Sequence, residues 1–198
     1  MQTKGELTRE RIIREATYLV SRKGLGDTSI SDIISATGLK KGSLYFHFSG
    51  KDALSLAILE KSRDEFMIFL DFSLVGNTPG ECLNNFFEEV MNLHKNAGFA
   101  GGCIFGNTAL EMSDKNKEVS VFIEGVFAEW TKKIQKVVKS AQALRQVRDD
   151  ISAGILARNI IAGIEGGIML ARLGKNEKQL RDCLKSIKML IELKIRTG

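Results

Sequence analysis

Apolar residues recur at the period of an α-helix along most of the chain. In the first segment, Ile12, Ala16 and Val20 fall on one side of a helix. Thr8 is a candidate N-cap, and Gly24 follows the last residue of the pattern. The spacing therefore predicts a first helix from Thr8 to Lys23.

Further segments show the same spacing or begin with residues that start helices. Thr78, Pro79 and Glu81 combine an N-cap, a proline at the first helical position and an acidic residue in the first turn. The second predicted helix is short and is capped by Thr28 or Ser29. The next five span residues 41–47, 52–73, 82–96, 103–112 and 116–143. The last two are a helix capped by Asp149 or Asp150 that runs to residue 173, and a helix over residues 177–196. Proline occurs once, and runs of alternating β-branched residues are absent. We predict an all-α fold of about nine helices.

The composition is that of a globular protein. Of the 198 residues, 43% are hydrophobic and 27% are charged, which excludes global disorder. Glu165 and Arg172 interrupt the most apolar run, residues 160–173, so we expect no membrane span and no membrane partner. The charged N-terminus lacks the apolar region of a secretory signal. Three scattered cysteines favour a reducing, cytoplasmic location and indicate neither a metal site nor a cofactor.

Charge is distributed unevenly along the chain, whose formal net charge is +5. Residues 1–51 carry nine Lys and Arg against five Asp and Glu, and residues 131–198 carry fifteen against six. Residues 61–130 carry five against eleven. A basic end next to an acidic middle indicates two functions, one of them involving a polyanion. For the C-terminal excess, a solvated lysine-rich helix face is the simpler interpretation.

Residues 28–48 have the pattern of a helix-turn-helix, two short helices joined by a glycine turn. Gly38 supplies the positive φ that this turn needs. We expect Ala36 to face inward so that the second helix packs across the first, and Leu39 and Leu44 to hold the second helix in the core. The outer face of the second helix then consists of Lys40, Lys41, Ser43, Tyr45 and His47. Their charged, hydroxyl and aromatic groups can reach phosphates and base edges.

The stretch from Arg9 to Leu59 resembles the DNA-binding domain of the tetracycline-repressor (TetR) family. The matching signature is T-S-I-S-D-I, then A-T-G-L-K-K-G-S-L-Y-F-H-F, then S-G-K-D-A-L. Gly50 departs from the polar residue that is more common at its position. The resemblance implies a three-helix, helix-turn-helix DNA-binding domain over residues 1–50. It also implies a helical effector-binding and dimerisation domain over residues 51–198.

The resemblance implies roles for individual residues. Tyr45, His47 and Lys51 correspond to phosphate contacts, and Thr28 and Ser29 to further phosphate clamps at a helix N-terminus. The complete predicted DNA-binding set is Thr28, Ser29, Lys40, Lys41, Gly42, Ser43, Tyr45, Phe46, His47 and Lys51. Tyr45 as a core aromatic, His47 as an ordinary helix-end histidine and Lys51 as plain surface remain alternatives.

The C-terminal part should hold a pocket and a dimer interface if it follows the family. The candidate pocket wall is Phe86, Phe87, Phe99, Cys103, Phe105, Asn107, Glu111, Met112, Phe122, Phe127, Trp130 and Met169. The candidate dimer interface is Ala162, Gly163, Gly166, Gly167, Leu180, Leu184, Ile187 and Ile191. Ordinary core packing is the alternative for the first set, and packing inside one subunit is the alternative for the second.

We therefore predict a homodimeric, ligand-responsive repressor that binds a palindromic operator in double-stranded DNA and is released by a small, largely apolar molecule. A DNA-binding structural or division regulator without a ligand is an alternative. A sensor that reacts with oxidants or electrophiles through Cys103, which is predicted at a helix start, is another. We expect no enzymatic activity, because the chain lacks the common metal-binding, nucleophile and nucleotide-binding motifs.

Overall fold

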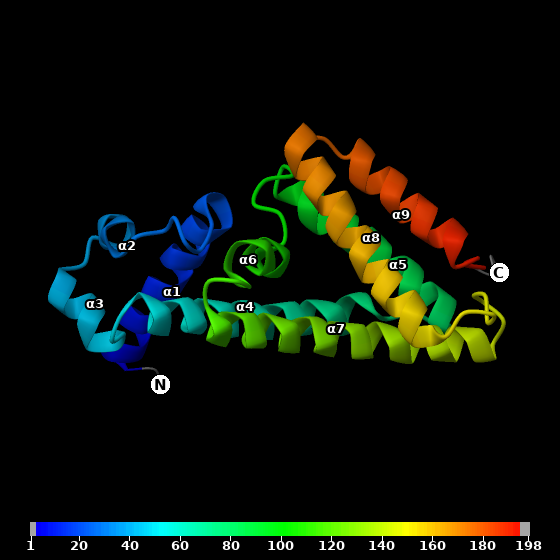
Figure 1. The fold of residues 1–198 in the computed structure, drawn as a ribbon, viewed down its shortest axis with the longest axis horizontal. Helices are drawn as coiled ribbons and strands as arrows, with labels where there is room; N and C mark the ends of the chain where they lie inside the picture. Colours follow the sequence, from blue (N-terminus) through cyan, green and yellow to red (C-terminus); the bar gives the residue numbers. More distant parts are fainter. Residues whose placement is uncertain (1–2, 195–198) are drawn as a thin grey trace. The chain divides into compact units, whose positions relative to one another are not determined.

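The computed structural model describes residues 3–194, which form nine helices and no strand (Figure 1). The prediction of an all-α fold is confirmed. The helices are α1 (Lys4–Lys23), α2 (Ile30–Thr37), α3 (Lys41–His47), α4 (Lys51–Ser73), α5 (Pro79–Asn96), α6 (Ile104–Met112), α7 (Lys117–Ala143), α8 (Ala153–Gly174) and α9 (Lys178–Leu190).

The chain divides into two compact units, whose boundaries differ from the single division near residue 50 that the sequence indicated. One unit contains the residues up to Phe66 together with Cys103–Ile123. The other contains Met67–Gly102 together with the residues from Glu124 onwards. The first unit therefore combines α1, α2 and α3 with α6 and the first turns of α7, although these segments are far apart in the sequence.

In the first unit, α1 starts earlier than the sequence predicted. Its N-cap is Thr3, whose side chain and that of Glu6 form a capping box. The hydroxyl of Thr8, the predicted cap, instead donates a hydrogen bond to the carbonyl of Lys4. The helix ends as predicted at Gly24, which has a φ of 96°. The side chains of the predicted stripe are buried, and Ile12 and Ala16 are fully so.

In the second unit, α5 begins as predicted at Thr78 and Pro79. The backbone N–H of Gly80 donates a 2.9 Å hydrogen bond to the side chain of Gln146, which follows α7. The ammonium of Lys188 on α9 donates to the side chains of Asn84 and Glu88 on α5. The unit is thus held by polar contacts as well as by its apolar core.

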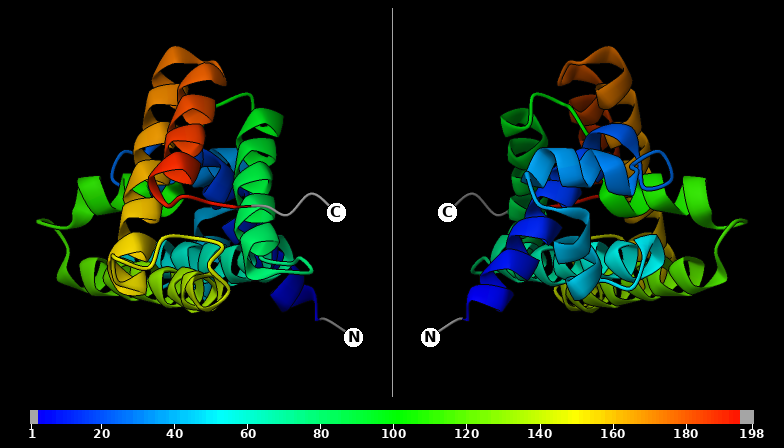
Figure 2. Two further views of the ribbon diagram at one scale, coloured as in Figure 1. Left: turned by 90° about the vertical axis from the view of Figure 1, so that its right-hand side faces the viewer. Right: turned by 90° about the vertical axis from the view of Figure 1, so that its left-hand side faces the viewer.

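The last two helices lie side by side (Figure 2), and their bounds differ from the prediction. Ser152, rather than Asp149 or Asp150, caps α8, since its side chain accepts from the N–H of Ile155. Helix α9 ends at Leu190, whereas the prediction continued to residue 196; residues 195–198 lie outside the described part of the chain. Glu192, just past the helix end, has a φ of 53°.

Helix α8 is long and apolar enough to cross a membrane by length and composition, although the sequence led us to expect no such span. Its inner face nevertheless packs in the protein core, where the side chains of Ile160, Ile164 and Ile168 are buried. A core helix passes the same test of length and hydropathy. Packing inside the protomer therefore accounts for the apolar inner face of α8.

Candidate nucleic-acid interface and helical C-terminal half

The turn between α2 and α3 has the geometry that the sequence predicted. Gly38 ends α2 in the left-handed region with a φ of 65°, and its N–H donates to the carbonyl of Ile34. Leu44 is completely buried, so α3 is fixed by its inner face. Ala36 was wrongly predicted to face inward. It is exposed, and the neighbouring Thr37 is buried instead, with its hydroxyl donating to the carbonyl of Ile33.

The outer side of α3 brings most of the predicted DNA-binding residues onto one surface. The exposed residues are Lys40, Lys41, Gly42, Tyr45 and Phe46, while Ser43 and His47 are half-buried. The Phe46 side chain is 83% exposed. No protein atom lies within 4 Å of the Cβ position at Gly42, so another molecule can approach the backbone there. This surface combines cationic, aromatic and hydroxyl groups, as DNA recognition requires.

Ring and charge contacts order this surface. The ammonium of Lys41 lies 5.8 Å from the ring centroid of Tyr45. The ring of Phe46 meets the His47 ring edge to face, with centroids 5.1 Å apart. These contacts are local to α3 and leave the phenol and the Phe46 ring accessible. Tyr45 is 44% exposed, which excludes the alternative that it is a core aromatic.

Thr28 does not fit the predicted role of a phosphate clamp. Its side chain is buried, and its hydroxyl donates a 2.6 Å hydrogen bond to the carbonyl of Gly24. A buried hydroxyl that already donates within its own turn cannot reach a phosphate. We correct the prediction: Thr28 stabilises the connection between α1 and α2.

Ser29 is exposed but takes part in a capping box. Its side chain accepts from the N–H of Asp32, and the Asp32 carboxylate accepts from the N–H and hydroxyl of Ser29. Lys23 lies 2.9 Å from the same carboxylate. These hydrogen bonds, from Lys23 first and then Ser29, hold the pKa of Asp32 well below its ordinary value. A carboxylate therefore already occupies the N-terminus of α2, and a phosphate contact by Ser29 stays a prediction.

Lys51 opens α4 and is half-buried. Its ammonium donates a hydrogen bond to the carbonyl of Gly26, in the turn between α1 and α2. Two of its three protons remain for a phosphate. The predicted phosphate contact is compatible with this position and stays a prediction.

Glu111 lies elsewhere than in the predicted pocket wall. Its two carboxylate oxygens accept hydrogen bonds from the backbone N–H groups of Leu25, at 2.9 Å, and Gly26, at 2.6 Å. The prediction that Glu111 lines the pocket wall with Asn107 is thereby corrected for Glu111, whose carboxylate oxygens accept hydrogen bonds from the turn. Sequence reasoning missed this contact because it joins residues 85 or more positions apart.

The other predicted pocket residues divide between the two compact units. Cys103, Phe105, Asn107, Met112 and Phe122 belong to the first, and Phe86, Phe87, Phe99, Phe127, Trp130 and Met169 to the second. Phe86 and Phe87 are fully buried, as core residues are. Met169 is 57% exposed on α8, so its assignment to a pocket wall is corrected. Cys103 caps α6 as its sulfur lies 3.5 Å from the nitrogen of Gly106; its role as a sensor stays a prediction.

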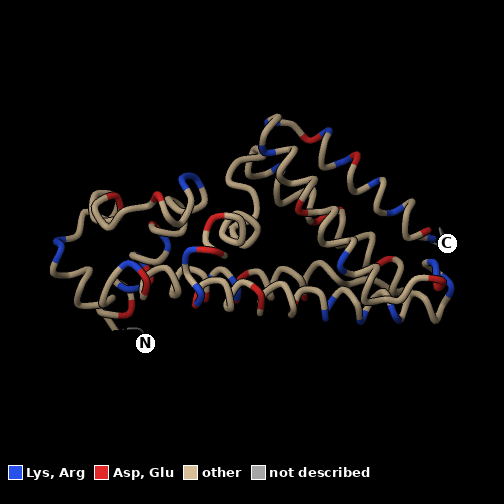
Figure 3. The backbone as a smooth tube through the Cα atoms, viewed as in Figure 1, with Lys and Arg blue, Asp and Glu red and all other residues tan. Residues whose placement is uncertain are grey.

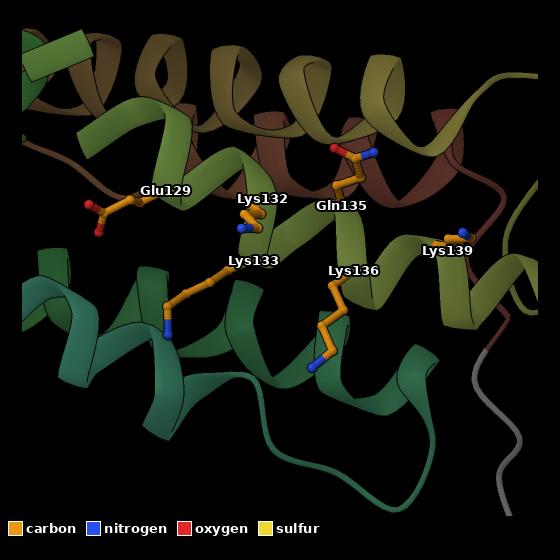
Figure 4. A pocket seen from close by; sticks show the side chains of 6 residues that line it. All are labelled: Glu129, Lys132, Lys133, Gln135, Lys136 and Lys139. Carbon is orange, nitrogen blue, oxygen red and sulfur yellow. The ribbon is translucent and has the colours of Figure 1, made fainter. Parts of the chain in front are cut away.

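A surface hollow of about 610 Å³ lies on α7 in the second unit (Figure 4). The residues that line it are Glu129, Lys132, Lys133, Gln135, Lys136 and Lys139. None of them was predicted as a pocket residue. Figure 3 shows Lys and Arg along this half of α7 and on α9, so the C-terminal excess of positive charge belongs to exposed helix faces.

The predicted dimer residues fall into two groups. Leu180, Leu184, Ile187 and Ile191 are at most 6% exposed and lie inside the protomer. A Cβ at Gly163 would come within 2.9 Å of the Ile187 side chain, and one at Gly167 within 2.9 Å of Cys183. These two glycines therefore allow α8 and α9 of one chain to approach closely. For Leu180, Leu184, Ile187, Ile191 and Gly167, burial within the protomer supports the alternative of packing inside one subunit. Gly163 is half-buried, and its place in a dimer interface stays a prediction.

On the outer face of α8, the other two predicted dimer residues remain accessible, because Ala162 is exposed and Gly166 is half-buried. Ala162, Gly166, Met169 and Leu173 form a stripe at steps of three or four residues, and the exposed Ile155 lies seven residues before Ala162, two turns away on the same side. Met189 and Leu190 on α9 are also exposed, by 69% and 67%. An apolar helix face with small residues at its centre suits the close approach of another helix.

Comparisons with known proteins match both halves of the chain. Residues 12–58 match the family model described as "Bacterial regulatory proteins, tetR family". Residues 79–187 match the model described as "Tetracyclin repressor-like, C-terminal domain".

Individual relatives cover nearly the whole chain. The transcriptional repressor DhaR of Mycobacterium sp. (strain GP1) is 25% identical over 174 residues, which are 87% of this chain and 86% of that protein. The crystal structure of a TetR transcriptional regulator from Chloroflexus aurantiacus J-10-FL is 31% identical, covers 98% of this chain and 99% of its own, and superposes with a TM-score of 0.88. The regulatory protein TetR from Rhodobacter sphaeroides is 25% identical over 92% of this chain and 98% of its own, with a TM-score of 0.87.

Proposed function

The chain belongs to the tetR family of bacterial regulatory proteins, and from this premise we propose that it is a dimeric repressor, released from a palindromic operator by a small, largely apolar molecule. Members of the family are DNA-binding transcription regulators and not enzymes. They act as dimers with small-molecule effectors. The proposed site of action is the cytoplasm, where bacterial DNA lies.

The proposal of DNA binding rests on the exposed surface of α3. Leu44 anchors the helix from inside, while Lys41, Tyr45 and Phe46 face outward. The Phe46 ring is 83% exposed and is therefore accessible to another molecule. The ring is suited to apolar contact with a thymine methyl group, and Lys41 to the acceptors of guanine.

Selection of duplexes from a randomised library by the purified full-length protein tests this proposal. We expect a palindrome whose half-sites lie about one helical turn apart, because a symmetric dimer presents two α3 helices. Enrichment of no sequence over the starting library would contradict the proposed function.

The effector is proposed from the family and from the core of the second unit, which is rich in aromatic residues. Native mass spectrometry of the purified protein should reveal a co-purifying small molecule. Adding that molecule should lower operator affinity, since a ligand shifts an equilibrium only if it binds the two states differently. A regulator that acts without a ligand would show operator affinity that no co-purifying compound changes.

A further inference from the structure

The turn between α1 and α2 is held by a carboxylate from a distant part of the sequence. Oε2 of Glu111 lies 2.9 Å from the backbone nitrogen of Leu25, and Oε1 lies 2.6 Å from that of Gly26. Glu111 belongs to α6, next to this turn in the first unit (Figure 1). It lies within the residues that match the C-terminal family domain, whereas Leu25 and Gly26 match the N-terminal one.

Glycine at two positions makes room for this carboxylate. A Cβ on Gly26 would lie 2.4 Å from Oε1 of Glu111, closer than real side chains approach. Gly24 has a positive φ of 96°, which by itself favours glycine, and a Cβ there would lie 3.0 Å from Oε2. Gly26 does not share the positive φ of Gly24. A Cβ at position 26 would therefore displace the Glu111 carboxylate from the turn.

Gly26 is also held from its other side. Its carbonyl accepts a hydrogen bond from the ammonium of Lys51, at the start of α4. The peptide groups around Gly26 thus connect Glu111 to Lys51, which is a proposed phosphate contact. Two residues after Gly26, the buried Thr28 hydroxyl bonds back to Gly24, and Ser29 then caps α2.

The body of α6 is itself fixed against the long helix α4. Phe105 is buried, and its ring centroid lies 5.5 Å from that of Phe66. Glu111 lies on a different side of α6 from Phe105, so its carboxylate can contact the turn between α1 and α2. A shift of α6 would consequently move the acceptor of two backbone hydrogen bonds that precede the helix-turn-helix.

We infer that Glu111 is a positioning residue for the DNA-binding surface: it fixes the turn before α2 and transmits the position of α6 to α2, α3 and Lys51. This inference rests on the proposed function, since it concerns affinity for an operator. A carboxylate suits the role because two N–H donors require two acceptor oxygens. Glutamine offers only one and would turn an NH₂ group towards the second donor.

The experiment breaks the same contact from both sides in the full-length protein. Glu111→Ala and Glu111→Gln remove the acceptor, Gly26→Ala fills its space, and the double variant Glu111→Ala/Gly26→Ala combines both. Glu118→Gln is the control for loss of a negative charge, and Gly125→Ala is the control for a glycine whose Cβ position is open. The readouts are affinity for the selected operator, affinity for an unrelated duplex, and hydrogen exchange of the 24–29 segment.

We expect each single variant to bind the operator about tenfold more weakly, which corresponds to about 1.4 kcal/mol. The double variant should bind like Glu111→Ala alone, because the clash partner of the new Cβ is gone. Segment 24–29 should exchange faster in every variant that lacks the contact. Affinity for the unrelated duplex should fall less, by about twofold, since Lys51 is repositioned but keeps its charge. A merely unstable variant would lose both affinities together.

The outcomes separate this inference from the proposed function. A wild-type protein that selects no duplex overturns the proposed function and this inference with it. If the wild type selects an operator that Glu111→Ala and Gly26→Ala bind equally well, the inference alone is wrong. It is also wrong if the two substitutions weaken binding additively, because they would then act at separate contacts.

Discussion

Nη2 of Arg11 lies 2.9 Å from the backbone carbonyl oxygen of Thr37, to which it donates a hydrogen bond. The contact joins the middle of α1 to the last residue of α2. A cation at the C-terminus of a helix complements both the helix dipole and a carbonyl that lacks a helical partner. Arg11 therefore contributes to the position of α2 before any DNA is bound.

Substitution of Arg11 should destabilise the protein modestly. We expect Arg11→Ala to lower the free energy of unfolding by about 1 kcal/mol and the melting temperature by about 2–4 °C. Arg14→Ala is the matched control, because Arg14 pairs only with the adjacent Glu15 and its side chain is 68% exposed. Thermal unfolding followed by circular dichroism measures both. Equal melting temperatures for the two variants would show that the Thr37 contact contributes nothing.

Loss of the Lys51 ammonium should weaken binding to all duplexes alike. A phosphate contact carries no sequence information, and each one contributes about one unit to the dependence of the logarithm of affinity on the logarithm of salt concentration. Lys51→Ala should therefore reduce this slope by about 1. Lys61→Ala serves as a control, since Lys61 pairs with Glu65 on α4. An unchanged slope in Lys51→Ala would remove Lys51 from the phosphate contacts.

Phe46 should affect sequence preference and leave stability unchanged. Its side chain is 83% exposed, so Phe46→Ala creates no cavity. Repeating the duplex selection with Phe46→Ala should relax the preference at one position of each half-site, where the wild type selects thymine. Leu44→Ala is the contrasting variant, because it removes a fully buried side chain and should lower the free energy of unfolding by about 2–5 kcal/mol. Identical selected sites for Phe46→Ala and the wild type would place the ring outside the groove.

The sequence features that predicted the helix ends involve residues close together in the chain. Ser29 with Asp32, Gly38, and Thr78 with Pro79 each act within one helix turn, and the structure has helix ends at all of them. Where several residues could cap, as around Asp149 and Ser152, the sequence pattern did not separate them.

The contacts that sequence reasoning missed depend on tertiary packing. Thr28 and Ser29 look equivalent in the sequence, but only the folded turn buries the first and exposes the second. Glu111 shares a helix face with Asn107 at a spacing of four residues, which led to a shared pocket role, while its partners lie 85 and 86 positions earlier. Helix α8 is apolar on both sides, so periodicity alone could not distinguish its inner face from its outer one.

Acidification should destabilise the protein through His94. Burial lowers the pKa of this imidazole below its ordinary value, so the unfolded chain binds the proton more readily than the folded one. The contribution is fully present above the unfolded pKa of roughly 6.5 and is lost as the pH falls below it towards and through the lower folded pKa. Urea unfolding between about pH 7.5 and 5.5 should show a declining free energy of unfolding, with a shallower decline in His94→Gln. Parallel declines in both proteins would assign the effect to other groups.

The outer face of α8 should control the oligomeric state. Gly166 is half-buried in the apolar stripe on this face, and outside its own stretch of helix no described atom lies within 4 Å of its Cβ position. The protomer can therefore accept an arginine there, whereas a partner helix at the same place could not. We expect Gly166→Arg to convert a dimer into a monomer at micromolar concentration in analytical ultracentrifugation and to lose tight binding to the palindrome.

Gly125→Arg separates this effect from the general cost of placing arginine in a helix. Gly125 likewise lies within a helix and has an open Cβ position, but it is exposed and belongs to α7. Both variants introduce the same side chain and charge into an α-helix, where arginine has the higher helix propensity, so neither should unfold the protomer. Only Gly166→Arg should dissociate the dimer. If both variants remain dimeric, the dimer interface lies elsewhere. If the wild type is itself a monomer, the proposal that two α3 helices bind the two halves of a palindrome is wrong.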